Sequence, residues 1–524
     1  MAVRSETGAG ETPETGRGKG GRRLAVFKAL ALLALLAVTA YGMLDGGLYF
    51  TPQWLPVAAG ILALALLTLL FRDYYKDVPR FGWVLVGLLG ALVAIKGLSL
   101  IWTISESLTI QELLRSAMYL ATFAVALAAV SYRSQVEPLV DGMFLVLTPV
   151  AGYGLLQKID PAEYPIGGVA PGRLNSTLEY ANTFAMVAAL GVMLGLARLD
   201  SLRNPLARGA YAALLLGFCV ALFFTFSRGG FVSLGLGLAV YLALTGDRLR
   251  GIANLLLLCA PLSWLLLRSR GHEALYQPAA AEEASLAAGG ALLIDLIVAA
   301  VAAFGLQAIY AAVSNRYGIA RETRRLLGVG AVAAVVLLAG AGGYVAFGAF
   351  SDSGAPADSS GGEGAAPGVG ERLTSLDSLR YAYWKVGLEA WRERPLTGTG
   401  AGTFEYTWLQ ERPIDTGVKQ IHNLYLEQGT ETGVFAFAAM VGLAAGLPLY
   451  TAAAALRTPE GGPGGAGAGR RALLAGFTGA IAVYLSSSAL EWHWYIPAST
   501  LFFFILAAVA VKYASFGRSE SPET

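Results

Sequence analysis

The chain has 524 residues, of which 55% are hydrophobic and 14% are charged, and its mean hydropathy is +0.57. Soluble domains carry about a quarter charged residues, so this composition excludes an ordinary soluble protein and predicts a membrane protein that contacts the lipid bilayer. The net charge of +2 favours no charged partner, and we expect no binding to nucleic acid.

The residues that usually hold metals and cofactors are sparse. Cys219 and Cys259 both lie within apolar runs, so neither a disulfide framework nor a cysteine metal site is expected. The three histidines do not form an HExxH motif, and the chain contains no P-loop and no GxGxxG motif. We therefore expect no metal and no cofactor.

Apolar runs long enough to cross a bilayer recur along the whole chain. Such a run needs about 17 to 25 residues, and we count about fourteen, with 12–14 as the range we expect. This predicts an all-α polytopic membrane protein with one large extracytoplasmic loop that contains amphipathic helices. The predicted spans are residues 24–44, 55–71, 81–102, 110–130, 139–156, 178–197, 211–226, 231–244, 252–267, 288–313, 326–350, 424–449, 472–490 and 497–513.

Composition also divides the chain into segments. Lys and Arg collect in every second loop, which predicts that both termini are cytoplasmic. The predicted segments are a disordered cytoplasmic tail (1–23), an N-terminal transmembrane bundle (24–350), the extracytoplasmic loop (351–421) with a flexible linker (351–370) and an ordered helical part (373–421), C-terminal transmembrane helices (422–515) and a cytoplasmic tail (516–524).

The ordered part of the loop begins with an amphipathic helix. Asp377 or Ser378 can cap it, and Pro395 stops it after about Arg394. Arg380 lies on the stripe that faces away from the charged residues of this helix. An arginine among tryptophans needs either cation–π contacts or an anion, and the helix alone favours neither.

Two arginines stand at the extracytoplasmic ends of predicted spans. Arg228 precedes two glycines, and a charge at a membrane boundary usually faces a cavity and a partner. We favour phosphate binding by its guanidinium over contact with lipid head groups. Ser176 and Glu179 have the spacing of a capping box, which does not explain Arg173 or Asn182 nearby. A helix N-terminus beside an arginine can bind an anion.

Polar residues also open the last predicted spans. His422 is predicted to begin a helix whose polar face includes Asn423 and Glu427. An imidazole can accept a proton from a sugar hydroxyl, although a structural hydrogen bond explains the residue equally well. Glu491 and His493 form a second polar group between tryptophans of an aromatic belt, and His493 is the less favoured base.

Four motifs, in this order, resemble the O-antigen ligase/polymerase family, which also includes protein O-oligosaccharyltransferases. They are RLNSTLEYANTFA, FSRGGFVSLGLG, SLRYAYWKVGLEAWRERPLTGTGAGTF and IHNLYLEQGTETGVFAF. The resemblance covers residues 173–443, and its most specific parts are the P-L-x-G-x-G-x-G-x-F run of residues 395–404 and the H-N-x-Y-L-E run of residues 422–427.

The resemblance implies transfer of a glycan from an undecaprenyl-diphosphate carrier to a hydroxyl acceptor outside the membrane, without a metal and with inversion at the anomeric carbon. His422 would be the base on the acceptor, and Arg228 and Arg380 would neutralise the diphosphate. The remaining candidates for substrate contact are Arg173, Asn182, Asn423, Glu427, Glu491 and His493.

Several alternatives stay open. Ligase and polymerase differ mainly in the acceptor, which can be a glycan, a lipid or a protein. A polytopic transporter or flippase of a lipid-linked saccharide would instead need polar residues near the middle of the membrane, where Lys96 is the one conspicuous candidate. The family places the protein in the cytoplasmic (inner) membrane with its active site on the extracytoplasmic face. The sequence does not indicate an oligomeric state.

Overall fold

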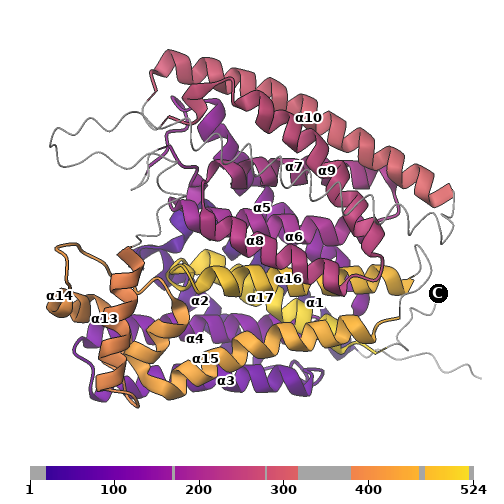
Figure 1. Ribbon diagram of the computed structural model, residues 1–524. Coiled ribbons are helices and arrows are strands. Elements are labelled where there is room, and N and C mark those ends of the chain that lie inside the picture. Colours follow the sequence, from indigo (N-terminus) through magenta and orange to yellow (C-terminus); the bar gives the residue numbers. More distant parts are fainter. Residues whose placement is uncertain (1–18, 168–171, 278–279, 317–378, 460–465, 518–524) are drawn as a thin grey trace, which may run out of the picture.

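A computed structural model describes residues 19–167, 172–277, 280–316, 379–459 and 466–517. All regular elements within these ranges are helices (Figure 1), and eleven of the helices are long and apolar enough to cross a membrane. This confirms the predicted all-α polytopic architecture. The predicted span at 326–350, the linker at 351–370 and most of both predicted tails lie outside the described residues.

Every other predicted span corresponds to a helix. In chain order these helices are α1 (Lys19–Leu44), α2 (Thr51–Thr68), α3 (Arg80–Leu98), α4 (Glu106–Ala129), α5 (Val136–Ile159), α6 (Ala181–Ser201), α7 (Pro205–Phe224), α8 (Arg228–Leu244), α9 (Arg248–Ser269), α10 (Glu282–Arg316), α15 (Leu424–Arg457), α16 (Ala466–Ser488) and α17 (Pro497–Ser515). Two of them are not among the eleven. With 17 residues, α8 is short, and α16 contains two arginines near its start and three serines at its end, which lower its mean hydropathy.

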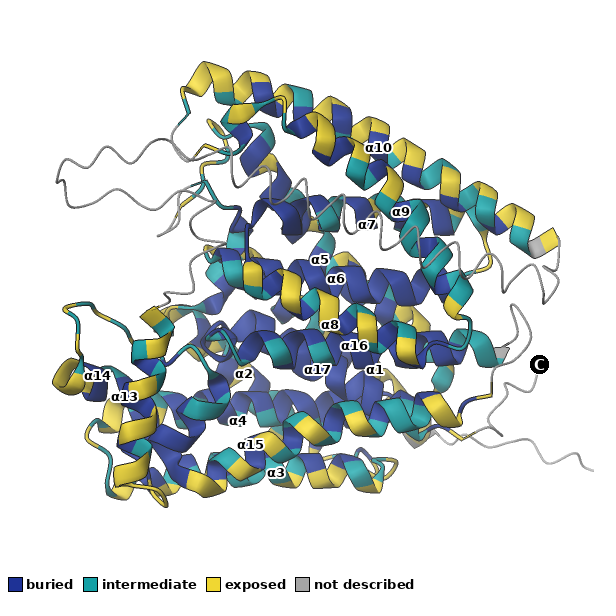
Figure 2. Ribbon diagram, viewed as in Figure 1, coloured by how far each residue is buried: buried dark blue, intermediate teal, exposed yellow. Residues whose placement is uncertain are grey.

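The bundle is built around α6 and α17. In the most apolar part of these helices 94% and 89% of the residues are buried, compared with 28% in α1, α2, α3 and α10. In Figure 2 the ribbon of α6 has almost entirely the dark blue of buried residues. Small residues allow α16 to pack closely on α6 and α8, because a Cβ atom added at Gly479 would lie 2.8 Å from the carbonyl oxygen of Gly237. The outer helices present apolar side chains to the lipid.

Two shorter helices, α13 (Leu379–Glu393) and α14 (Phe404–Glu411), lie together at one end of the bundle, away from the end where the C-terminus lies (Figure 1). A turn that we call the glycine loop, residues 398–403, joins them. Its three glycines have φ between +64° and +112°, a region that other residues rarely adopt. The predicted loop helix and its end before Pro395 are confirmed.

Two local predictions are wrong. His422 does not lie on a helix, because its φ is +61° and α15 begins only at Leu424. Ser176 and Glu179 do not form a capping box, since both have positive φ; Ser176 begins a 3-10 turn before α6, and Glu179 directly follows that turn. Instead, the Ser176 hydroxyl donates to the carbonyl oxygen of Val150 at 2.5 Å.

Candidate functional site

A buried carboxylate, Glu491, lies in the short segment between α16 and α17 and joins residues from three other parts of the chain. Its oxygens accept hydrogen bonds from the Tyr180 hydroxyl at 2.6 Å and from the Asn182 amide at 2.7 Å. The carboxylate also forms an ion pair with Arg380 on α13 and lies 3.4 Å from Nδ1 of His422. Only 2% of the Glu491 surface is exposed, so these contacts replace water.

The surroundings of Glu491 keep it charged. Burial by itself would raise the pKa of the carboxyl group, because desolvation disfavours the ionised form. The hydrogen bond with His422 and the positive charge of Arg380 outweigh burial and hold the pKa below its ordinary value of 4.5. Glu491 is therefore a fixed negative charge at neutral pH.

The ring of His422 is held by aromatic neighbours. It stacks on Tyr383 with a centroid distance of 5.8 Å and meets Trp492 edge to face at 6.3 Å. Its side chain is 18% exposed, so one edge stays accessible. With a proton on Nδ1 donated to Glu491, Nε2 keeps its lone pair. This arrangement orients the imidazole to accept a proton at Nε2.

Arg173 connects this cluster to the turn between α7 and α8. Its Nη2 donates to the Asn182 side-chain oxygen at 2.6 Å, and its Nε donates to the Thr225 carbonyl oxygen at 2.8 Å. Just after Thr225, the Ser227 side chain caps α8, whose first residue is Arg228. Arg173 thus contacts the turn that leads into Arg228.

Arg228 lies beside the same carboxylate segment. Its side chain is exposed and within electrostatic reach of Arg380, and a Cβ atom added at the following residue, Gly229, would contact Leu490 at 3.7 Å. We call the assembled group the rim cluster; it comprises Arg173, Tyr180, Asn182, Arg228, Arg380, His422 and Glu491. The rim cluster thus gathers three guanidinium groups around one carboxylate, and guanidinium groups match the oxygens of phosphate groups.

Two of the predicted contact residues make structural hydrogen bonds. The Asn423 side chain accepts from two backbone N–H groups of the first turn of α15, at 3.1 and 3.0 Å. Glu427 is 1% exposed and accepts from the Tyr495 hydroxyl at 3.1 Å. These contacts indicate that Asn423 and Glu427 hold the backbone at the start of α15 in place rather than contact a substrate directly.

His493 makes its hydrogen bonds outside the rim cluster. It is fully buried, with Nδ1 2.9 Å from the Thr183 hydroxyl and Nε2 2.7 Å from the Ser487 hydroxyl. Burial lowers the pKa of His493 to about 4, because the charged form would lose its water. This neutral, doubly bonded imidazole ties α6 to α16 and favours a structural role.

A second group of buried charges lies beside the glycine loop, and sequence reasoning did not bring its members together. The loop wraps the Glu431 carboxylate, which accepts from the backbone N–H groups of Gly402 at 2.7 Å and Phe404 at 3.1 Å. Nearby, Lys96 and Glu112 form an ion pair at 3.2 Å. Charges within the apolar runs of α3 and α4 were the available signal, but their pairing depends on the packing of two helices.

One comparison with known proteins gives a match. Residues 211–441 match a family described as O-antigen ligase, whereas no curated protein matches the chain. The matched range includes Arg228, Arg380 and His422, and ends before Glu491. It confirms the resemblance drawn from the sequence motifs.

Proposed function

We propose, from the match of residues 211–441 to the O-antigen ligase family, that the protein is a membrane glycosyltransferase that moves or polymerises a glycan carried on undecaprenyl diphosphate. The glycan is joined to a hydroxyl group of an acceptor glycan, lipid or protein. The observation that carries this proposal is that one buried carboxylate, Glu491, holds both the imidazole of His422 and the guanidinium of Arg380.

The proposed base is His422. The acceptor O–H gives its proton to Nε2 while its oxygen attacks the anomeric carbon of the glycan. The bond between that carbon and the diphosphate oxygen breaks, and its electron pair leaves with the carrier. The Nδ1 contact with ionised Glu491 supports this role, because a carboxylate stabilises the imidazolium that forms.

Arginines would stabilise the leaving group. Negative charge grows on the diphosphate as the glycosidic bond breaks, so fixed positive charges bind the transition state more strongly than the ground state. Arg228 and Arg380 supply these charges from α8 and α13, and Arg173 positions the turn that carries Arg228. Guanidinium groups pair with phosphate oxygens in bidentate geometry.

A transporter or flippase of a lipid-linked saccharide is the alternative, and Lys96 is the residue that suggests it. Lys96 lies in the last turn of α3, next to the ends of the bundle helices, and pairs with Glu112. A transport path would use polar groups near the middle of the membrane. The position of Lys96 at the same end as the glycine loop favours transfer chemistry there.

The proposal is tested by reconstitution with a purified oligosaccharide linked to undecaprenyl diphosphate and a membrane extract that contains the acceptor. Product mass and chain length identify the acceptor and separate ligase from polymerase. We expect His422→Ala to lose at least a hundredfold in transfer rate, a typical contribution of a general base. The matched control is His272→Ala, a half-buried histidine in the loop between α9 and α10. Equal rates in the two variants would remove the proposed base.

A further inference from the structure

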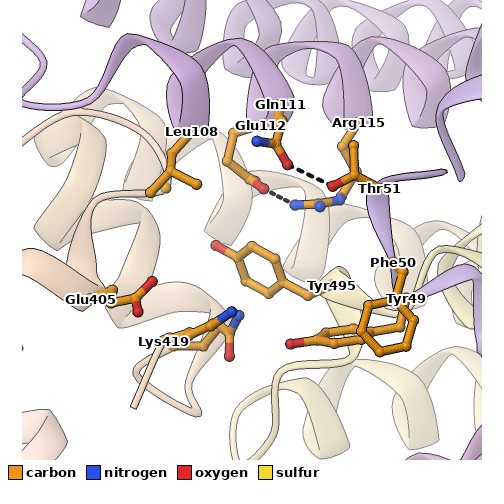
Figure 3. A pocket seen from close by; sticks show the side chains of 12 residues that line it. Tyr49, Phe50, Thr51, Leu108, Gln111, Glu112, Arg115, Glu405, Lys419 and Tyr495 are labelled. Carbon is orange, nitrogen blue, oxygen red and sulfur yellow. Dashed lines mark hydrogen bonds and ion pairs between the residues drawn. The ribbon is translucent and has the colours of Figure 1, made fainter. Parts of the chain in front are cut away.

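A pocket of about 190 Å³ opens beside the glycine loop (Figure 3). Its walls come from the start of α2, from α4, from the glycine loop and α14, from the segment before His422, and from Tyr495. The volume is smaller than the roughly 300 Å³ or more of a site that encloses a whole drug-sized ligand. The pocket therefore suits one terminal unit of a larger molecule.

The charges that line this pocket are balanced. Glu112 and Arg115 form a buried ion pair, and Glu405 faces the pocket across from Arg115, on the same side as Lys419 (Figure 3). Among the residues that line the pocket, two carboxylates and two cations balance, whereas three guanidinium groups gather in the rim cluster. A diphosphate is therefore attracted to the rim cluster, whereas this pocket favours an uncharged ligand.

The pocket offers hydrogen-bonding groups for such a ligand. Within the described part of the chain, the side chains of Glu405, Lys419 and Gln420 make no hydrogen bond or ion pair. Gln111 accepts from the Thr51 hydroxyl at 2.9 Å through its oxygen, so its NH₂ group stays available. A carboxylate that accepts, together with an ammonium and amides that donate, matches the alternating donor and acceptor groups of adjacent sugar hydroxyls.

Aromatic side chains complete the site and connect it to His422. Tyr49 and Phe50 line the pocket and lie edge to face with a centroid distance of 5.1 Å. The ring of Tyr49 also lies edge to face with the ring of Trp492, with a centroid distance of 5.4 Å, and Trp492 in turn packs against the ring of His422. Gln420 lies two residues before His422 in the chain. The aromatic lining of the pocket thus reaches the ring of His422 through Trp492.

We propose that this pocket binds a neutral sugar unit of the acceptor and sets acceptor specificity through Glu405, Lys419 and Gln420. This inference rests on the proposed function and adds that the donor and the acceptor bind at two separate places. The carrier diphosphate binds the arginines of the rim cluster, and the acceptor glycan enters from the other side of His422. The acceptor is therefore a glycan, free or attached to a larger molecule, rather than an amino-acid side chain alone.

The test uses the full-length protein with the acceptor identified in the transfer reaction. We expect Glu405→Gln combined with Lys419→Ala to raise the KM for the acceptor at least tenfold, with kcat at saturating acceptor unchanged. Inhibition by added undecaprenyl diphosphate should be unchanged in this variant and at least tenfold weaker in Arg228→Ala. The matched control is Glu389→Gln combined with Lys385→Ala on the exposed face of α13.

The outcomes separate the two proposals. An acceptor KM equal to that of the α13 control overturns the pocket assignment, and so does weaker inhibition by undecaprenyl diphosphate in the pocket variant, because it assigns the pocket to the donor. A wild-type protein that transfers no glycan, or a fully active His422→Ala variant, contradicts the proposed function itself. Light scattering and thermal unfolding of each variant show whether it is folded before its kinetics are compared.

Discussion

Glu491 acts in the proposed reaction through the residues it holds. The Glu491 carboxylate has four hydrogen-bonding or ionic partners. Because it binds His422 and Arg380 at the same time, it fixes the distance between the imidazole and the guanidinium. Its charge also balances the imidazolium formed when His422 accepts a proton. Glu491 is therefore a positioning residue whose removal alters orientation and charge together.

Glu491→Gln separates these effects because glutamine keeps the size of the side chain and one oxygen acceptor. We expect kcat to fall about a hundredfold or more, since the imidazolium loses its carboxylate and Arg380 loses its ion pair. The KM for the acceptor should change much less. Initial rates at saturating substrates measure this, with Glu389→Gln on α13 as the control. A kcat equal to that of the control would show that the carboxylate charge is not needed.

The pH dependence of transfer distinguishes His422 from His493. Because the pKa of Glu491 lies below 4.5 and that of His493 lies near 4, neither group changes charge above about pH 5.5. The ion pair of Glu491 is present at higher pH and is lost only as the pH falls through its lowered pKa. An acidic limb of the transfer rate above about pH 5.5 therefore comes from a group other than Glu491 and His493.

We expect this limb to persist in His493→Gln, measured as kcat/KM against pH, even if the variant is less stable. Loss of the limb in His493→Gln would assign the base to the buried histidine.

The comparison also bears on what sequence can predict. His493 and Glu491 are two residues apart in one motif, and only the backbone path between α16 and α17 decides which of them faces His422.

At the scale of elements, the glycine loop belongs to one of the two most specific sequence motifs of the chain, and its contacts indicate a structural role. The glycines allow backbone N–H groups to converge on Glu431, where side chains would not fit. Helix positions could be predicted because apolar runs of the required length identify them. The shape of the loop could not, because it depends on contacts with Thr103 and α15 that lie far away in the sequence.

Gly400→Ala tests this role. Gly400 has φ +112°, and an added Cβ atom would lie 2.3 Å from the Thr103 hydroxyl oxygen. The strained backbone costs about 1–3 kcal/mol before the steric clash is added, so we expect a clearly lower unfolding temperature in detergent. Gly417→Ala is the control, because nothing lies within 4 Å of a Cβ atom there. Equal unfolding temperatures would mean that the loop adapts without strain.

At the scale of the whole molecule, the helix order separates two ends with different charge. The segment between α2 and α3 lies opposite the pocket, because α2 starts beside the pocket and α3 returns to it. This far segment contains Arg72, Lys76 and Arg80, and the Lys512 ammonium at the end of α17 contacts the Asp77 carbonyl oxygen. The positive-inside rule predicts that this end is cytoplasmic. We therefore predict that the rim cluster faces the extracytoplasmic side of the membrane.

Single cysteines test this orientation directly. Gly417→Cys lies in an exposed segment at the end that carries the rim cluster, and Lys76→Cys lies in the exposed segment at the opposite end. In a background without Cys219 and Cys259, we expect a membrane-impermeant maleimide to label Gly417→Cys in intact cells with a permeabilised outer membrane. Lys76→Cys should react only after the inner membrane is broken. The reverse pattern would place the rim cluster on the cytoplasmic face, where an acceptor outside the membrane could not reach His422.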